Sequence, residues 1–208
     1  MTDRLSSLAA IEAEIWAELA RACRDRTHAW RSPVLATAAT VATVAPVATG
    51  ARAASGAASG VTTTAIGDAR VVILREVDAA QRRLLVFTDA RSGKVAQLRE
   101  HPHGTLLMWS PALGWQLRCR VRLSLETSGL ATSSRWARIK HSPAAQDYMS
   151  PLPPGAPLPA LAPVHDAPQR EHFGVITAEV SSIDWFDLHA DGHRRARLDG
   201  ATSAWLQP

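Results

Sequence analysis

Residues 115–125, WQLRCRVRLSL, are the stretch that decides the fold. Apolar side chains occupy every second position from Leu117 to Leu125, and three arginines and a serine stand between them. Successive side chains of a strand point to opposite faces, so this alternation predicts a strand with one buried and one polar face. Residues 105–109 precede it across a turn at 111–114, which predicts an antiparallel pair.

Further strands and short helices are predicted on both sides of this pair. The expected strands are residues 34–44, 70–75, 83–88, 173–188, 193–198 and 203–206, and the expected helices are an N-terminal amphipathic helix capped by Ser6 or Ser7 and residues 93–100 and 133–141. Many antiparallel strands with few helices are typical of a β-barrel. We therefore expect one mainly β domain over residues 1–208, with a low-complexity Ala/Ser/Gly/Thr loop insertion at about 46–66 and a proline-rich loop at about 150–168.

The composition narrows the class of protein. The chain has 208 residues and a formal net charge of +4, and all of its 23 basic residues except Lys94 and Lys140 are arginines. Arginine suits phosphate and carboxylate groups because its planar fork donates two hydrogen bonds at once. No series of aromatic residues stands between the arginines, which argues against a nucleic-acid partner.

The cysteines and the chain's apolar segments indicate the compartment. Cys23 and Cys119 are far apart and match neither a disulfide framework nor a zinc site, so two free thiols in the cytoplasm are expected. The charged N-terminal stretch is unlike a secretory signal. Residues 34–66 carry one charge, Arg52, but are too rich in Ala, Thr, Ser and Gly to span a membrane, so no membrane association is predicted.

The turn at residues 88–94, TDARSGK, is the strongest local signal for function. It leads from a strand end into a helix N-terminus and carries hydroxyls, an arginine and a lysine. Unpaired N–H groups and the positive end of the helix dipole favour a phosphate there. The alternative is an ordinary capped helix with solvated charges. No catalytic nucleophile, carboxylate pair or metal site stands out, which suggests a cofactor that brings its own chemistry.

In this order the motifs resemble the pyridoxamine 5'-phosphate oxidase family of FMN-binding split β-barrels, in the branch with an Arg-Ser-x-Lys turn. The resemblance is carried by RVVILR at 70–75, FTD at 87–89, RSGK at 91–94, His101-Pro102, QLR at 116–118, the stretch 148–155 ending in Pro-Pro-Gly, and the terminal Arg-rich strand followed by Trp205 and Pro208. It implies an FMN-binding split β-barrel fold and a homodimer with FMN at the interface.

The resemblance also implies the site residues. Those that would bind FMN are Arg70, Val71, Val72, Ile73, Leu74, Phe87, Thr88, Arg91, Ser92, Lys94, Trp185, Arg197 and, from the second subunit, Gln116. Those that would bind an anionic substrate are Arg75, Lys140, Arg194 and Arg195. The chain departs from the family in four places. Arg75 stands where the family has a lysine, and the family's Tyr/Arg/Ser substrate-phosphate set falls near Trp136, Lys140 and Ala144, so that only a positive charge is retained. Gly93 stands where an arginine is expected before the turn lysine, so Arg91 would substitute for it, and the terminal Arg-Leu-His-Asp-Arg is shortened to residues 194–197, RRAR.

The function that we predict from the sequence is an FMN-dependent oxidoreductase. It would transfer a hydride from a small amine or alcohol substrate to the flavin, with oxygen as acceptor, and would need no side-chain nucleophile. The alternative is a non-catalytic flavin- or haem-binding split-barrel protein, because the substrate side departs most from the family pattern.

Overall fold

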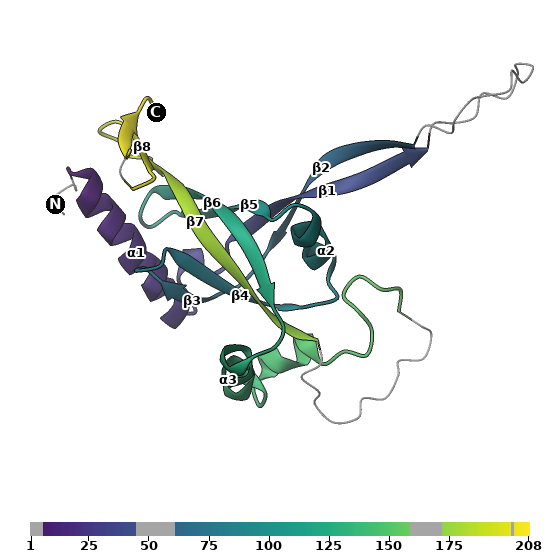
Figure 1. The fold of residues 1–208 in the computed structure, drawn as a ribbon. Coiled ribbons are helices and arrows are strands. Elements are labelled where there is room, and N and C mark those ends of the chain that lie inside the picture. Colours follow the sequence, from purple (N-terminus) through teal and green to yellow (C-terminus); the bar gives the residue numbers. More distant parts are fainter. Residues whose placement is uncertain (1–5, 45–60, 159–171, 201) are drawn as a thin grey trace, which may run out of the picture.

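The computed structural model describes residues 6–44, 61–158, 172–200 and 202–208 (Figure 1). The helices are α1 (Leu8–Arg24), α2 (Gly93–Glu100) and α3 (Leu130–Ile139), with short 3-10 turns η1 (Ala29–Arg31) and η2 (Pro143–Tyr148). The strands are β1 (Val34–Val44), β2 (Val61–Val71), β3 (Leu74–Asp78), β4 (Arg83–Asp89), β5 (His103–Ser110), β6 (Trp115–Glu126), β7 (Phe173–Asp187), β8 (Arg194–Leu198) and β9 (Ala204–Leu206). The predicted mainly β fold is confirmed.

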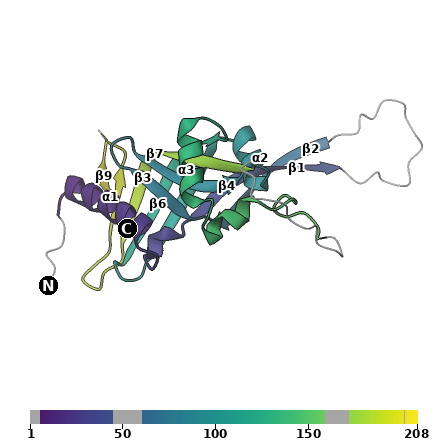
Figure 2. The ribbon, with the colours of Figure 1, turned by 90° about the horizontal axis from the view of Figure 1, so that it is seen from below.

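The strands form one antiparallel sheet that curves strongly. Its order is β2-β1-β5-β6-β7-β4-β3, and β8 adds to β7 and β9 to β8. Strand β7 is long enough to pair with β4 along its first half and with β8 along its second, while β6 runs beside nearly all of it. Figures 1 and 2 show α1 at one end of the molecule and the β1–β2 ribbon projecting as a two-stranded arm from the other.

The alternation in β6 produces the expected two faces. Leu117, Cys119, Val121 and Leu123 are buried, whereas Arg118, Arg120 and Arg122 are exposed. The apolar stripe of α1, with Ile11, Ile15 and Leu19 at its centre, packs against the same core. The hydroxyl of Ser7 caps α1 by accepting a hydrogen bond from the Ala10 N–H. A second, smaller core lies beneath α3 and η2.

Two sequence-based boundaries need correction. The predicted strand 70–75 is two strands, because β2 ends at Val71 and the chain turns before β3 begins at Leu74. Residues 61–66, predicted as loop, open β2 and pair with residues 39–44 of β1. Their β-branched run VTTT favours a strand. Residues 46–60 of the predicted insertion and 159–168 of the predicted proline-rich loop lie outside the described residues, and residues 149–158 lie outside helices and strands.

The turn between β5 and β6 supplies a test of the fold. Gly114 has a φ of +67°, and a Cβ there would lie 2.7 Å from the carbonyl oxygen of Leu188. Gly114→Ala is therefore expected to lower the free energy of unfolding by about 1–3 kcal/mol in urea denaturation. Gly67→Ala, where a Cβ meets open space, is the control and should change it by less than about 0.5 kcal/mol. Equal effects would contradict the turn geometry.

The described residues supply three further findings. None of their helices is long and apolar enough to cross a membrane. They contain no group of three or more His, Cys, Asp or Glu side chains that could hold a metal ion. Cys23 and Cys119 are free thiols, and burial raises the pKa of Cys119 to about 12.

Candidate functional site

Lys94 lies at the centre of the turn that leads from β4 into α2. Its ammonium Nζ lies 3.1 Å from both the Thr88 and the Ser92 hydroxyl, and these two residues are buried. The Ser92 hydroxyl faces Lys94 instead of capping the helix. Burial, followed by the charge of Arg70, lowers the pKa of Lys94, while the Asp89 charge opposes this. Burial and a neighbouring positive charge both disfavour the protonated form of Lys94. An anionic ligand at this helix N-terminus would stabilise that form.

A cavity of about 350 Å³ opens beside Lys94. Its walls come from the β2–β3 connection, the end of β4, the start of α2, and η2 with the segment after it. It brings together seven of the residues predicted from the sequence, which are Val71, Val72, Ile73, Arg75, Phe87, Thr88 and Lys94. The remaining lining residues are Asp89, Asp147, Tyr148 and Pro154. One apolar wall and one cationic end are typical of small-molecule sites.

Arg75 is the second cation of this cavity. Its guanidinium stacks on the Phe87 ring, with Cζ 5.7 Å from the ring centroid. Its Nε–H is buried and has no hydrogen-bond partner among the described residues. A buried donor without an acceptor is costly, so this atom favours a ligand that brings an acceptor.

Tyr148 is a cavity residue to which the sequence analysis assigned no role. Burial raises the pKa of its hydroxyl, and the charge of Arg75 and a hydrogen bond with it oppose that rise. Its ring packs edge-on against Phe173 in the second core. It is the chain's only tyrosine and opens the 148–155 stretch that contributes to the family resemblance, which was the available signal.

Arg70 lies next to the cavity but is engaged by the protein. Its guanidinium forms an ion pair with Asp68 and donates a hydrogen bond to the side-chain oxygen of Gln97 at 2.8 Å. It also donates to the Thr37 hydroxyl. This network connects α2 to β1 and β2. The positive charge of Arg70 also lowers the pKa of Lys94.

Arg91 lies outside the lining of the cavity. Its guanidinium donates to the Asp89 carboxylate and to the carbonyl oxygens of residues 150, 151 and 152. The expectation that it substitutes for a phosphate-binding arginine before Lys94 does not fit this orientation.

Gln116 and Arg197 lie together on the outward face of the sheet. Directly paired residues share a face, and Leu107, Arg118, Asp184 and Arg197 form one such row across four strands. The neighbouring row contains Trp109, Gln116, Phe186 and Arg195. We call the surface formed by these eight residues the outer face. Burial raises the pKa of Asp184, but hydrogen bonds from Arg195 and Arg118 outweigh it and hold that pKa below its usual range.

Comparison with known proteins supports one family. The pyridoxine/pyridoxamine 5'-phosphate oxidase of Caulobacter vibrioides is 27% identical over 158 residues, which cover 71% of this chain and 70% of that protein. No protein-family model matches the chain. Among solved structures, a pyridoxamine 5'-phosphate oxidase-related, FMN binding protein of Nostoc punctiforme has a TM-score of 0.65 at 20% identity and covers 98% of this chain and 100% of that one.

The chain resembles the pyridoxamine 5'-phosphate oxidase family in sequence and in fold. PhzG of Burkholderia lata, solved with tetrahydrophenazine-1-carboxylic acid, has the same fold, with a TM-score of 0.61 at 18% identity over 99% of this chain and 95% of that one. The predicted split β-barrel is thus confirmed, whereas the branch with the Arg-Ser-x-Lys turn stays a prediction.

Two of the residues predicted to bind FMN have side chains that lie in the main core and outside the lining of the cavity. Leu74 is fully buried in the main core. Trp185 is fully buried as well. Its ring centroid lies 5.3 Å from that of Trp115 and 6.3 Å from that of Trp205. The side chains of consecutive strand residues alternate, so Phe186 and not Trp185 shares the outer face with Gln116.

The side chains of the four residues predicted to bind substrate lie in separate places in the structure. Arg194 stacks on Trp185 and Trp205, with Cζ 5.4 and 5.9 Å from the ring centroids, and pairs with buried Asp187. Lys140 is exposed at the C-terminal end of α3. Arg195 lies on the outer face and pairs with Asp184 at 2.7 Å. Of the four predicted substrate residues, Arg75 is the one that lines the cavity.

Proposed function

We propose that this protein binds FMN and acts as a flavin-dependent oxidoreductase on a small anionic substrate. The observation that carries the proposal is the cavity in which Lys94, Thr88 and the N-terminus of α2 adjoin the apolar β2–β3 connection. A phosphate fits the cationic end, and an apolar ring system fits the wall formed by Val71, Val72 and Phe87. The unpartnered Nε–H of Arg75 is a donor that such a ligand can satisfy.

Each residue then has a distinct role. Lys94, with the Thr88 and Ser92 hydroxyls beside it, would hold the phosphate by charge-assisted hydrogen bonds. Val72 and Ile73 would exclude water from one side of the ligand. Bound FMN would supply the hydride acceptor for oxidation of an amine or alcohol, with oxygen as the final acceptor. Arg75 would position the anionic group of the substrate, which fixes the orientation of the bond to be oxidised.

We further propose that a second copy of the chain covers the outer face. Val71, Leu107 and Trp109 are 63%, 37% and 44% exposed, which is unusual for large apolar side chains in one region. Val71 and Leu107 both pair with Val34, so they flank it on the same side of the sheet. Val71 also lines the cavity. A copy seated here would bring its own Gln116 and Arg197 to the cavity edge, which supports a site completed by two subunits.

The first test of the proposal is whether the purified protein contains FMN. Protein purified after expression should carry a flavin absorbance spectrum, and denaturation should release FMN, identified by chromatography against FMN, FAD and riboflavin. Stripped protein should regain thermal stability on addition of FMN. A colourless protein that also shows no thermal shift with FMN would overturn the proposed function.

A non-catalytic flavin-binding role is the second candidate. It is favoured by the substrate side, where Arg194 and Lys140 do not face the cavity. Anaerobic mixing of the FMN-loaded protein with pyridoxamine 5'-phosphate, and then with other small amines and alcohols, separates the two. Bleaching of the flavin spectrum by any of them supports the oxidoreductase, and an unchanged spectrum across the series supports the binding role.

The pKa of Lys94 predicts how FMN binding depends on pH. The pKa is lowered from 10.5 by burial and by Arg70, and a phosphate beside the ammonium would raise it again, so the protonated lysine binds FMN more tightly. FMN affinity is expected to be nearly constant from about pH 7, where the phosphate is a dianion, up to the lowered pKa, and to fall by up to about tenfold per pH unit above it. Flavin fluorescence titrations at increasing alkaline pH measure this. Lys94→Arg should move the decline to higher pH, and an unmoved decline would assign it to another group.

A further inference from the structure

Arg91 is held in place by several hydrogen bonds to other parts of the protein. Its Nε–H donates to one oxygen of Asp89 at 3.1 Å and one Nη donates to the other at 2.7 Å, which is a fork-to-carboxylate pair. The backbone N–H of Arg91 donates to Asp89 as well, at 2.7 Å. The Asp89 side chain is only 2% exposed, so this pair is anchored in the interior at the end of β4.

The same guanidinium reaches a segment about sixty residues away in the chain. It donates to the carbonyl oxygens of Ser150 at 2.7 Å, Pro151 at 3.1 Å and Leu152 at 3.3 Å. These residues follow η2 and belong to residues 149–158, which lie outside helices and strands. Four of those residues are prolines, which have no N–H to donate to a strand ladder. Arg91 therefore supplies hydrogen bonds that regular structure does not.

The segment that Arg91 holds is part of the cavity wall. Tyr148 precedes the three bonded carbonyls and Pro154 follows them, and both line the cavity beside Lys94. We infer that Arg91 is a positioning residue, which fastens residues 150–152 to the β4–α2 turn and thereby sets the Tyr148 and Pro154 side of the cofactor cavity. The inference rests on the proposed function for its ligand, and it assigns phosphate binding to Lys94 and not to Arg91.

The chemistry of the contact requires arginine. A guanidinium presents five N–H donors in a rigid plane, enough for one carboxylate and three carbonyls together. A lysine at position 91 would keep the charge but has three donors at a single atom, and could not reach both groups at these distances. Arg91→Lys keeps the charge but removes the donor geometry, whereas Arg91→Ala removes both. Comparing the two variants therefore separates the effect of charge from that of geometry.

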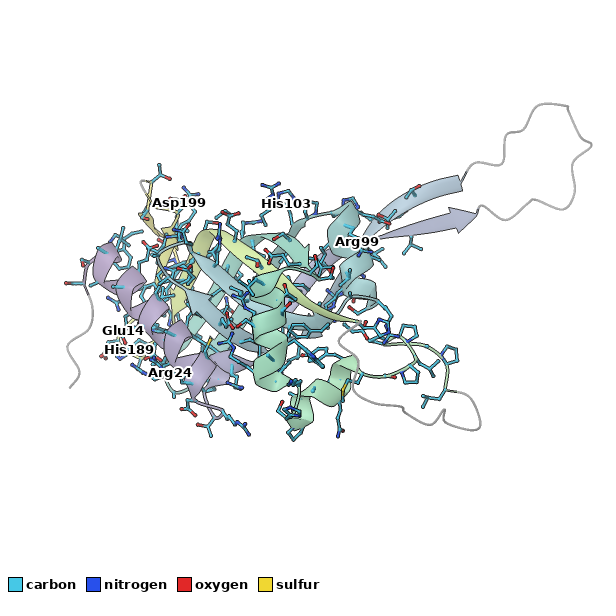
Figure 3. All side chains as sticks on the ribbon, turned by 60° about the horizontal axis from the view of Figure 1, so that its bottom comes forward. Glu14, Arg24, Arg99, His103, His189 and Asp199 are labelled. Carbon is cyan, nitrogen blue, oxygen red and sulfur yellow. The ribbon has the colours of Figure 1, made fainter. Side chains whose placement is uncertain are left out.

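The experiment compares FMN with riboflavin, which lacks the phosphate. Both Arg91 variants are expected to lower the affinity for the two flavins by a similar factor, on the order of tenfold, so that the preference for FMN is unchanged. Arg99→Ala is the matched control, because Arg99 is an exposed arginine on the adjacent α2 (Figure 3) and should leave both affinities unchanged. A loss confined to FMN in Arg91→Ala, with FMN binding retained in Arg91→Lys, would show a direct phosphate contact and overturn the inference.

Two further measurements separate positioning from a general loss of stability. Hydrogen exchange on the ligand-free protein should speed up at the amides of Leu152 and Ala156 in both Arg91 variants and not in Arg99→Ala. In a Tyr148→Phe background, Arg91→Ala should cost less flavin affinity than it does alone, because both changes act on the same wall. Additive losses, or unchanged exchange at residues 150–156, would overturn the inference. If the unaltered protein binds neither flavin, the proposed function fails, and the exchange measurement alone decides the role of Arg91.

Discussion

Replacing Lys94 with alanine is expected to weaken FMN binding by about 10- to 150-fold, which corresponds to the roughly 1.5–3 kcal/mol of a hydrogen bond to a charged group. The ammonium is the cation that faces the cavity at the N-terminus of α2, and two buried hydroxyls hold it in place. Without it, the phosphate would keep only neutral donors. Fluorescence titration of stripped protein with FMN measures the loss.

The loss should be specific for the phosphate. Riboflavin affinity should change little in Lys94→Ala, so the preference for FMN over riboflavin should nearly disappear. Lys140→Ala is the natural control because it removes the only other lysine of the chain, which is exposed at the end of α3. If Lys140→Ala reduces FMN affinity as much as Lys94→Ala, the effect reflects overall charge and the assigned phosphate site is wrong.

The sequence predicted those parts of the fold that short-range periodicity determines. The two-residue alternation from Leu117 to Leu125 located β6, and its faces are as expected. The helix predicted at residues 93–100 is α2 with the same bounds. The break between Val71 and Leu74 could not be read in the same way, because the four residues between Arg70 and Arg75 are all apolar and show no alternation. The chain turns there to reach a different neighbour, β4 instead of β1.

The residues of the candidate site also divide into those that local sequence predicts and those that depend on tertiary contacts. Thr88, Ser92 and Lys94 are close in sequence, and one turn brings them together, so a local motif sufficed to find them. Arg91 belongs to the same motif but is oriented by carbonyls about sixty residues later, which local sequence does not contain. Arg194 was predicted to bind substrate because the resemblance places residues 194–197 at the family's substrate-side arginines. Its stacking on Trp185 and Trp205 depends on the pairing of β7, β8 and β9, which only the tertiary structure supplies.

Trp185→Ala is expected to lower the free energy of unfolding by about 3–5 kcal/mol, a large part of the stability of a typical domain. The ring is fully buried between Trp115 and Trp205 and also carries the stacked guanidinium of Arg194, so truncation leaves a cavity and an arginine without its platform. Urea denaturation followed by circular dichroism measures the change. Trp185→Phe, which retains a ring, should cost less and keeps the protein folded for comparison.

Phe186→Ala tests the face assignment at the adjacent position. Phe186 points to the outer face beside Gln116 and Arg195, so its truncation should cost at most about 1 kcal/mol of stability, as for other partly exposed positions. Its effect should instead appear in self-association, measured by sedimentation, and in flavin affinity, because the outer face is where a second copy is proposed to sit. The reverse pattern, with Phe186→Ala unfolding the protein and Trp185→Ala weakening flavin binding alone, would contradict the register of β7 and restore Trp185 as the aromatic neighbour of the flavin.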